Sequence, residues 1–223
     1  MDLKLKGLRA LITGSSRGLG FATARALAME GCRVAINSRD PEKLTGVAQK
    51  LSAETGVEIL PLAGDVGSRE VPSDLIQGIT DAWDGLDILI TNAGGPPSGP
   101  FENHSDETWL KAVDLSLLSH VRLIRAALPY LRQSPVASVL TITSISVKQP
   151  ITNLVLSNSI RAATLGLTKS LALELGAQGI RFNSILPSWT ETERVQELMA
   201  YRASTNRTRS EERRVGKECR SRW

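Results

Sequence analysis

The sequence has only two cysteines, Cys32 and Cys219, and it has no long apolar run. Two cysteines are too few for a disulfide framework, and their spacing does not match a metal site. No window approaches the run of about 18 apolar residues that a membrane-spanning helix needs, and residues 1–6 do not lead into the apolar core of a signal peptide. These absences predict a cytoplasmic protein without a metal site and without a membrane partner.

The positive charge of the chain is concentrated at its C-terminal end. The formal net charge is +4 at pH 7, and residues 209–223 (RSEERRVGKECRSRW) contribute three of these charges. This stretch has no apolar periodicity, and it resembles the translation of a common sequencing adapter fused in frame to a shortened gene. We therefore expect it to be non-native, with a natural basic arm as the alternative. The remaining charge is too small to support nucleic-acid binding.

Short apolar runs alternate with helix-forming stretches along most of the chain. The expected strands are residues 10–12, 32–37, 57–62, 86–91, 138–143 and 181–187. The expected helices are residues 21–28, 41–54, 71–83, 105–132 and 153–176. Apolar strands that alternate with helices are typical of a parallel sheet covered on both faces. The sequence therefore predicts a single α/β domain over residues 1–208.

The stretch LITGSSRGLG, residues 11–20, predicts a strand, a tight turn and the start of a helix. Glycines allow the backbone to approach a ligand closely, and the free N–H groups at a helix N-terminus attract anions. An ordinary strand-to-helix turn also favours glycine, but here a second strand follows at the distance expected of a βαβ unit. The stretch therefore predicts a nucleotide site that holds a pyrophosphate.

Motifs that resemble those of one enzyme family follow one another in order. They are Thr13-Gly14 with Gly18 and Gly20, Asp65-Val66, Asn92-Ala93-Gly94, Ser144, and Pro187 with Thr192. Together they resemble the short-chain dehydrogenase/reductase family over about residues 5–205, and its 3-oxoacyl-[acyl-carrier-protein] reductases in particular. The resemblance implies a doubly wound Rossmann fold, hydride transfer between a nicotinamide cofactor and a carbonyl or alcohol, and a homo-oligomer. It also implies that the chain is truncated before a further helix and an edge strand.

The resemblance implies a role for each cofactor-binding position. The predicted pyrophosphate turn comprises Gly14, Ser16, Arg17, Gly18, Leu19 and Gly20. Asp65 and Val66 would contact the adenine, Asn92 and Gly94 would form the floor of the cleft, and Thr192 would hold the nicotinamide carboxamide.

The residues after the second strand predict the choice of cofactor. A carboxylate there would bind the ribose 2′-hydroxyl of NAD, but the sequence reads Asn37-Ser38-Arg39. Arg39 can bind a phosphate through a fork of donors, and Arg17 adds a second positive charge. The sequence therefore predicts NADP, with NAD as the less favoured cofactor. The alternative is that Arg39 is a solvated turn residue paired with Asp40.

The predicted catalytic positions depart from the family pattern. The family uses Asn, Ser, Tyr and Lys, and the matching positions here hold Ser116, Ser144, Ser157 and Arg161. A tyrosine has a pKa near 10 that a neighbouring lysine lowers further, whereas serine is a much weaker acid. Arginine stays cationic and does not release a proton usefully at neutral pH. The Ser157 and Arg161 pair is therefore a poor replacement for the family's proton donor.

Other residues offer a substitute for the missing acid. Lys148 follows Ser144 by four residues, and a partly desolvated lysine can act as an acid. Tyr201 and His120 are weaker candidates, and an ordered water is a further one. Two hypotheses stay open: an NADP-dependent reductase of a carbonyl substrate, and an NADP-binding protein with little or no dehydrogenase activity. In either case we expect substrate contacts from loops 95–101 and 148–154.

Overall fold

The computed structural model describes residues 2–193, 195–196 and 199–200. The chain divides into two units, Met1–Ser188 and Trp189–Trp223, and each is described by itself. In the second unit, the Thr192 hydroxyl accepts the Val195 N–H at 3.3 Å, and the Thr192 carbonyl accepts the Gln196 N–H at 3.0 Å. The predicted non-native stretch 209–223 and Tyr201 lie outside the described residues.

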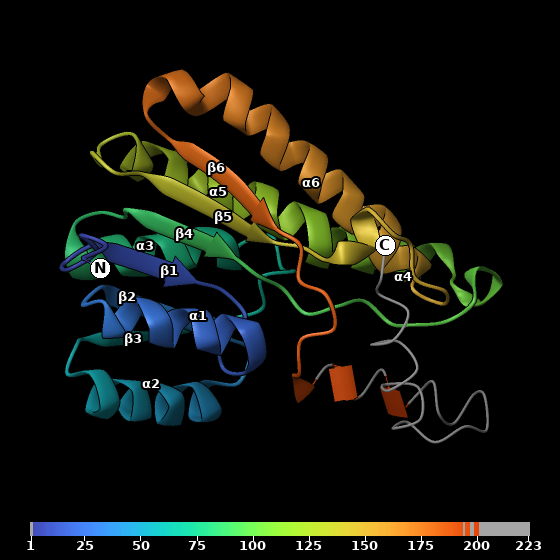
Figure 1. The fold of residues 1–223 in the computed structure, drawn as a ribbon, viewed down its shortest axis with the longest axis horizontal. Helices are drawn as coiled ribbons and strands as arrows, with labels where there is room; N and C mark the ends of the chain where they lie inside the picture. The colour runs from blue at the N-terminus through green and yellow to red at the C-terminus, as the bar shows by residue number, and fades with distance from the viewer. Residues whose placement is uncertain (1, 194, 197–198, 201–223) are drawn as a thin grey trace. The chain divides into compact units, whose positions relative to one another are not determined.

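A six-stranded parallel sheet forms the centre of the first unit, with the strand order β3-β2-β1-β4-β5-β6 (Figure 1). The strands are β1 Arg9–Ile12, β2 Arg33–Ser38, β3 Ile59–Ala63, β4 Ile88–Thr91, β5 Ser138–Ile142 and β6 Arg181–Ile185. Each predicted strand is therefore present, with ends shifted by one or two residues. The order reverses direction at β1, which pairs with β2 on one side and with β4 on the other. This is the doubly wound Rossmann arrangement.

Helices connect the strands. They are α1 Gly18–Met29, α2 Pro41–Thr55, α3 Val71–Trp83, α4 Asp106–Val113, α5 Ser119–Leu131 and α6 Val155–Leu175. Helix α2 begins where Asp40 accepts the Lys43 N–H at 3.0 Å, and it ends at Gly56, whose φ is +71°. The helix expected over residues 105–132 is divided between α4 and α5 by a π-helical turn at Asp114–Leu118.

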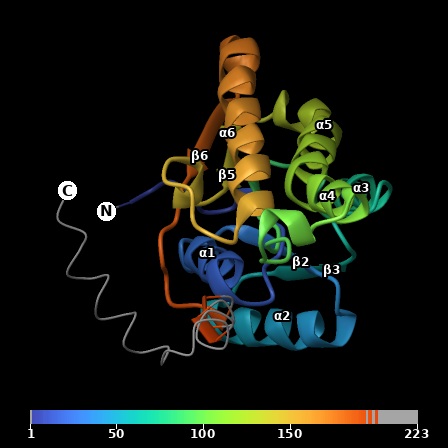
Figure 2. The ribbon, with the colours of Figure 1, turned by 90° about the vertical axis from the view of Figure 1, so that its right-hand side faces the viewer.

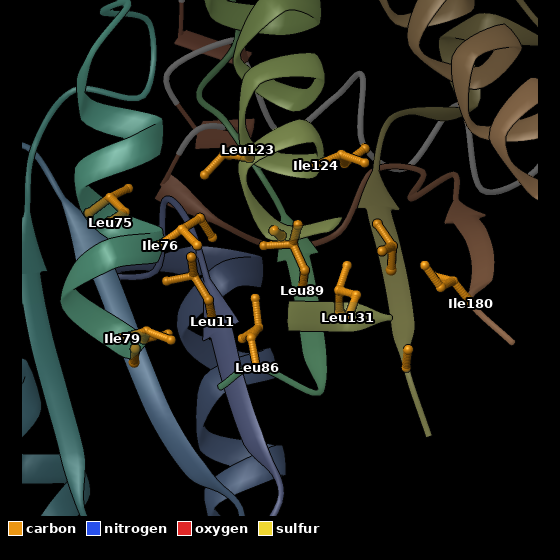
Figure 3. Packing of buried hydrophobic residues seen from close by; sticks show 14 of the residues in the cluster. Leu11, Leu75, Ile76, Ile79, Leu86, Leu89, Leu123, Ile124, Leu131 and Ile180 are labelled. Carbon is orange, nitrogen blue, oxygen red and sulfur yellow. The ribbon is translucent and has the colours of Figure 1, made fainter. Parts of the chain in front are cut away.

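Helices α1 and α2 cover one face of the sheet, and α3, α5 and α6 cover the other (Figures 1 and 2). An apolar core lies on each face. In β1, Ala10 and Ile12 face the core under α1 and α2, whereas Leu11 faces the core under α3, α5 and α6. Figure 3 shows this second core, where side chains of α3 and α5 surround Leu11 and Leu89. The alternation follows from the two-residue period of a strand, and burial of both faces explains why β1 and β4 are almost entirely apolar.

A polar network closes the amino edge of the sheet. Asp87 accepts hydrogen bonds from the Arg9 backbone N–H, the Arg9 side chain and the Ser134 hydroxyl, at 2.7–3.0 Å. Burial raises the pKa of Asp87, but these hydrogen bonds outweigh it, so the net pKa lies below its ordinary value. The network keeps the carboxylate charged and fully bonded on the side of the sheet away from the predicted nucleotide turn.

Two further properties concern the described residues only. None of their helices has both the length and the apolar character required to cross a bilayer. Among the same residues, no three His, Cys, Asp or Glu side chains are grouped so that they could hold a metal ion.

Candidate cofactor and active site

The predicted phosphate turn lies at the carboxyl end of β1, where the strand order reverses. Gly14 and Gly18 have φ values of +57° and +59°, which favour glycine over other residues. A Cβ added to Gly20 would lie 2.3 Å from the backbone oxygen of Gly14. The turn can pack this tightly against the start of α1 only because these positions lack side chains.

Thr13 and Asn92 lock the turn to the end of β4. The Thr13 hydroxyl donates to the Asn92 carbonyl at 2.8 Å and accepts the Asn92 N–H at 2.9 Å. The Asn92 carboxamide donates to the carbonyls of Gly14 and Thr13, at 3.0 and 3.3 Å. Asn92 thus positions the backbone of Thr13 and Gly14 at the start of the turn. Gly94 follows in exposed chain, where an added Cβ would meet nothing within 4 Å.

The start of α1 offers backbone donors to an anion. Arg17 is the N-cap residue, its backbone is extended, and it makes no side-chain cap. The first amides of a helix have no acceptor within the helix, and this end carries the positive pole of the helix dipole. Ser16 and Leu19 are half-buried here, whereas Arg17 is exposed. This donor set fits the pyrophosphate of a dinucleotide.

Two arginines are exposed near the nucleotide turn and the end of β2. Arg17 precedes α1, and Arg39 follows β2 directly. Asp40 uses its carboxylate to cap α2, and no ion pair between Arg39 and Asp40 forms in the part of the chain that the structure describes. The alternative in which Asp40 neutralises Arg39 is therefore not the arrangement found.

The predicted adenine contacts follow β3. Asp65 is half-buried, and one of its carboxylate oxygens accepts the Gly67 N–H at 2.9 Å. Val66 is only 7% exposed and packs in the core beside α3 and α5. Asp65 therefore retains a carboxylate oxygen beyond that bond, whereas the Val66 side chain belongs mainly to the core.

The predicted catalytic serine, Ser144, directly caps a short 3-10 helix after β5. Its Oγ accepts the Ser146 N–H at 3.1 Å, so one lone pair of the hydroxyl has a fixed direction. Ser157 is half-buried in the first turns of α6, one turn before Arg161. These positions place both hydroxyl groups on segments that begin at the carboxyl edge of the sheet.

Arg161 is a buried cation, 9% exposed, that reaches from α6 to the ends of two strands. Its Nη1 donates to the carbonyls of Ile142 and Thr143, at 3.2 and 3.3 Å. Its Nη2 donates to the Ala93 carbonyl at 3.5 Å. A single guanidinium therefore joins the carboxyl ends of β4 and β5, which a lysine, with a single nitrogen, would do less completely.

Ser116 lies in the π-helical turn, and its hydroxyl is buried without a hydrogen-bond partner among the described residues. Its carbonyl accepts the Thr164 hydroxyl of α6 at 2.6 Å. Thr164 is one helical turn beyond Arg161, so the π turn and the predicted catalytic face of α6 are in contact. Isolated π turns occur frequently at functional sites.

His120 is buried next to these residues, with Nδ1 2.6 Å from the Thr91 hydroxyl. Burial, helped by the positive charge of Arg161, lowers the pKa of His120 to about 3. The imidazole is therefore neutral near pH 7. It can orient Thr91 at the end of β4, but it cannot act as a cationic acid.

Lys148, the predicted substitute acid, ends the short helix that begins after Ser144. Its side chain is exposed, so the structure does not provide the partial desolvation on which its predicted role depends. Its catalytic role stays a prediction.

The two loops predicted to contact the substrate lie together. Gly99 donates to the Asn153 carbonyl at 2.9 Å and forms an isolated parallel bridge with Leu154. A cavity of about 330 Å³ opens beside this contact, lined by Gly99, Pro100, Phe101, Pro150, Ile151, Thr152, Asn153, Val155 and Asn158. Asn158 donates to the Ile151 carbonyl at 2.9 Å and so fixes the second loop on α6. The cavity is thus held by hydrogen bonds within the chain.

Sequence reasoning missed two contacts of this region. One is the bond from Thr164 to Ser116, and the other is the inward orientation of Asn37 at the end of β2. Thr192 belongs to the second unit, so its contact with a nicotinamide stays a prediction.

Comparison with known proteins places these features in context. The family model described as short chain dehydrogenase matches residues 9–203. Dehydrogenase/reductase SDR family member 4 of Oryctolagus cuniculus is 33% identical over 184 residues, covering 82% of this chain and 70% of that protein. Dehydrogenase/reductase SDR family member 2, mitochondrial, of Homo sapiens is also 33% identical and is covered over 65% of its length. The chain thus spans about two thirds of these relatives.

Solved structures of reductases also resemble this chain in fold. L-sorbose reductase from Gluconobacter frateurii, complexed with NADPH and L-sorbose, superposes with a TM-score of 0.88 at 30% identity, over 92% of this chain and 78% of that one. A variant of actinorhodin polyketide ketoreductase with NADPH has a TM-score of 0.87 at 29% identity, over 92% and 79%. An NADH-dependent reductase responsible for alginate metabolism has a TM-score of 0.79 at 30% identity, over 83% and 78%.

Proposed function

The chain belongs to the short-chain dehydrogenase family, and we propose that it is an NADP-dependent oxidoreductase that acts on a small carbonyl or alcohol substrate. One observation carries the proposal. The glycine turn after β1 is locked to the end of β4 by Thr13 and Asn92, and it presents the free amides of α1 at the point where the strand order reverses.

The cofactor preference rests on charge. Arg17 is exposed in the turn, Arg39 is exposed directly after β2, and Asp40 is occupied as a helix cap. Two guanidinium groups favour a 2′-phosphate over a 2′-hydroxyl, because they offer charge-assisted bonds that only the phosphate accepts strongly. Two of the similar structures contain NADPH, whereas a third similar reductase is described as NADH-dependent, so the arginines carry the argument.

At the reacting end, we assign Ser144 to the substrate oxygen. Because the Ser146 N–H already occupies a lone pair of the Ser144 Oγ, the Ser144 O–H is left to donate. Bound NADPH would supply the hydride. Ser157 and Arg161 would hold the ribose of the nicotinamide, and the fixed charge of Arg161 would favour negative charge that develops on the substrate oxygen. Because His120 is neutral, we assign the proton to Lys148 or an ordered water, with Tyr201 as the weaker alternative.

The substrate class follows from the cavity between loops 95–101 and 148–154. None of the side chains that line it is charged. A neutral carbonyl compound suits this lining better than a phosphorylated or carboxylated one, because no lining side chain could pair with a phosphate or carboxylate group. Within this class we include 3-oxoacyl-type substrates, which the motif pattern favours. A homo-oligomer, a cytoplasmic location, truncation of the parent protein and a non-native origin of residues 209–223 stay predictions.

Titration of the full chain with NADPH, followed by assay of a panel of neutral ketones and 3-oxoacyl thioesters, tests the proposal. We expect saturable binding and slow turnover that Lys148→Met reduces and Ser157→Ala largely retains. Lys169→Met serves as the matched control, because Lys169 is an exposed lysine further along α6. Loss of turnover in Ser157→Ala but not in Lys148→Met would contradict the assigned roles.

The double variant Ser157→Tyr with Arg161→Lys separates the two hypotheses. If the natural chain binds NADPH without turnover and the double variant gains activity, the protein is a nucleotide-binding protein whose proton donor has been lost. If the natural chain turns over and the double variant brings no gain, the reductase hypothesis stands.

A further inference from the structure

Asn37 is a buried polar residue at the carboxyl edge of the sheet. It is the fifth residue of β2, it is 1% exposed, and it lies between β1 and β3. A carboxamide in such a place must find partners for two N–H donors and one carbonyl oxygen, because a buried polar group without a partner destabilises the fold. The bonds that Asn37 makes therefore indicate what this position does.

The Asn37 carboxamide spans two segments that are distant in sequence. Its Nδ2 donates to the carbonyls of Leu62 and Gly64, at 2.9 and 3.1 Å. Its Oδ1 accepts the Gly14 N–H over a longer distance of 3.4 Å. Both donors and the acceptor of the side chain are therefore used within the protein.

The backbone of Asn37 strengthens the same connection. Its N–H donates to the Ser15 hydroxyl at 2.9 Å, and its carbonyl accepts the Ser15 N–H at 2.8 Å. The Ser15 hydroxyl in turn donates to the Ile12 carbonyl at 2.7 Å. Asn37 thus fixes the first residues of the glycine turn to β2 through its side chain, at Gly14, and through its backbone, at Ser15.

We propose that Asn37 is a positioning residue for the dinucleotide, an inference that rests on the proposed function. Gly14 opens the turn assigned to the pyrophosphate, and Gly64 immediately precedes Asp65, assigned to the adenine. One carboxamide therefore sets the distance between the phosphate-binding and adenine-binding segments. Both donors of the Asn37 side chain are used by Leu62 and Gly64, so Asn37 does not bind the ribose. Ser38 and Arg39 are then the residues that distinguish the 2′-phosphate of NADP from the 2′-hydroxyl of NAD.

This assignment predicts different effects of an acid at two neighbouring positions, Asn37 and Ser38. Asn37→Asp would replace two donors by a carboxylate oxygen that faces the carbonyl oxygens of Leu62 and Gly64. The variant should lose the connection and weaken both NADP and NAD. Ser38 is only half-buried, and its hydroxyl donates to the Asp40 carbonyl at 3.3 Å. Ser38→Asp should leave the connection intact and repel only the 2′-phosphate.

Calorimetric titration of the full chain with NADP⁺ and with NAD⁺, together with thermal unfolding, tests the inference. We expect Asn37→Asp to raise both dissociation constants by the same factor, at least about tenfold (about 1.4 kcal/mol). Ser38→Asp should raise the constant for NADP⁺ by a similar factor and leave that for NAD⁺ unchanged. Asp87→Asn, which disrupts the network at the opposite edge of the sheet, should lower the melting temperature without changing either constant.

A second substitution keeps the test decisive if Asn37→Asp fails to fold. Asn37→Ser retains one small donor, and it should give a smaller, equal loss of affinity for both nucleotides. Unchanged constants in the folded Asn37 variants, or a loss confined to NADP⁺, would overturn the inference. If the natural chain itself gave no heat with either nucleotide, the proposed function would fail first, and the inference with it.

Discussion

The carboxyl edge of the sheet has two halves that differ in how their buried polar groups are satisfied. Around β1, β2 and β3, the side chains of Thr13, Ser15 and Asn37 all bond to backbone groups of neighbouring segments. Around β5 and α6, the buried hydroxyls of Ser116 and Ser146 have no partner among the described residues. The polar side chains named in the nucleotide half are all bonded within the chain, whereas the reacting half contains two buried hydroxyls that are not, within the part of the chain that the structure describes.

This difference separates binding from chemistry. A preorganised nucleotide site loses little entropy when its ligand binds, because its backbone is already fixed. The reacting half is organised mainly by Arg161, which donates to three carbonyls, and by neutral His120, which lies against Thr91. Changes in the reacting half should therefore reduce turnover more than nucleotide affinity, because only the ribose contacts of Ser157 and Arg161 come from this half.

The largest effect is expected at Gly20, in the nucleotide half. In Gly20→Ala the new Cβ would lie 2.3 Å from the Gly14 carbonyl oxygen, a backbone atom that cannot move without opening the turn. We expect nucleotide affinity to fall about a hundredfold and the unfolding free energy to fall by about 1–3 kcal/mol. Calorimetry and denaturant titration measure the two effects.

Gly46→Ala is the matched control for Gly20→Ala. Gly46 lies within α2, and an added Cβ would meet nothing within 4 Å. It should leave affinity unchanged and stabilise the fold by about 0.5–1 kcal/mol. Equal affinity losses in both variants would remove the argument from close packing.

The next effect is expected at Arg161, which is the centre of the reacting half. Arg161→Met removes the donors to Ile142, Thr143 and Ala93, so three carbonyls at the strand ends lose a partner. The unfolding free energy should fall by about 3 kcal/mol, and turnover should fall further than nucleotide affinity. Arg125→Met, at an exposed position on α5, should change stability by less than about 0.5 kcal/mol. A loss of nucleotide affinity as large as the loss of turnover would contradict the division between a binding half and a reacting half.

His120 makes a smaller, pH-dependent contribution. Its folded pKa of about 3 lies below its ordinary value of 6.5, so the unfolded chain binds a proton that the folded chain does not. The resulting stability is present above pH 6.5 and is lost as the pH falls towards 3, by about 1.4 kcal/mol per unit. Lowering the pH from 7 to 5 should therefore cost the natural chain about 2 kcal/mol more than His120→Asn, as measured by urea unfolding. A constant difference between the two proteins would show that His120 titrates normally.

The smallest effect concerns cofactor choice in the nucleotide half. Arg17→Ala with Arg39→Ala should raise the Michaelis constant for NADP at least about tenfold and leave that for NAD nearly unchanged. Arg125→Ala is again the control. Equal changes for both cofactors would mean that neither arginine discriminates the 2′-group.

Much of the nucleotide half was predictable from sequence because its signals are local. Gly14, Gly18 and Gly20 lie within a single turn, and Pro41 and Gly56 mark the ends of α2. The strands are recognisable from their short apolar runs. The inward orientation of Asn37 was not predictable, because it depends on carbonyls of Leu62 and Gly64 that only the β2–β3 pairing brings near.

The reacting half was harder to predict because its contacts are between distant segments. The π turn at Ser116 adds one residue to a helical turn, and apolar periodicity does not reveal it. Burial of Arg161 and exposure of Lys148 both depend on where α6 and the loop after Ser144 lie against the strand ends. The residue types suggested a partly desolvated Lys148, which the structure does not show, and they did not indicate that Arg161 is buried.

The most direct test of the account is calorimetric titration of the full chain with NADPH and, separately, with NADH. The account predicts saturable heat at one site per chain, with NADPH bound at least about tenfold more tightly than NADH. The absence of heat with both nucleotides, from protein that is folded by circular dichroism, would contradict it.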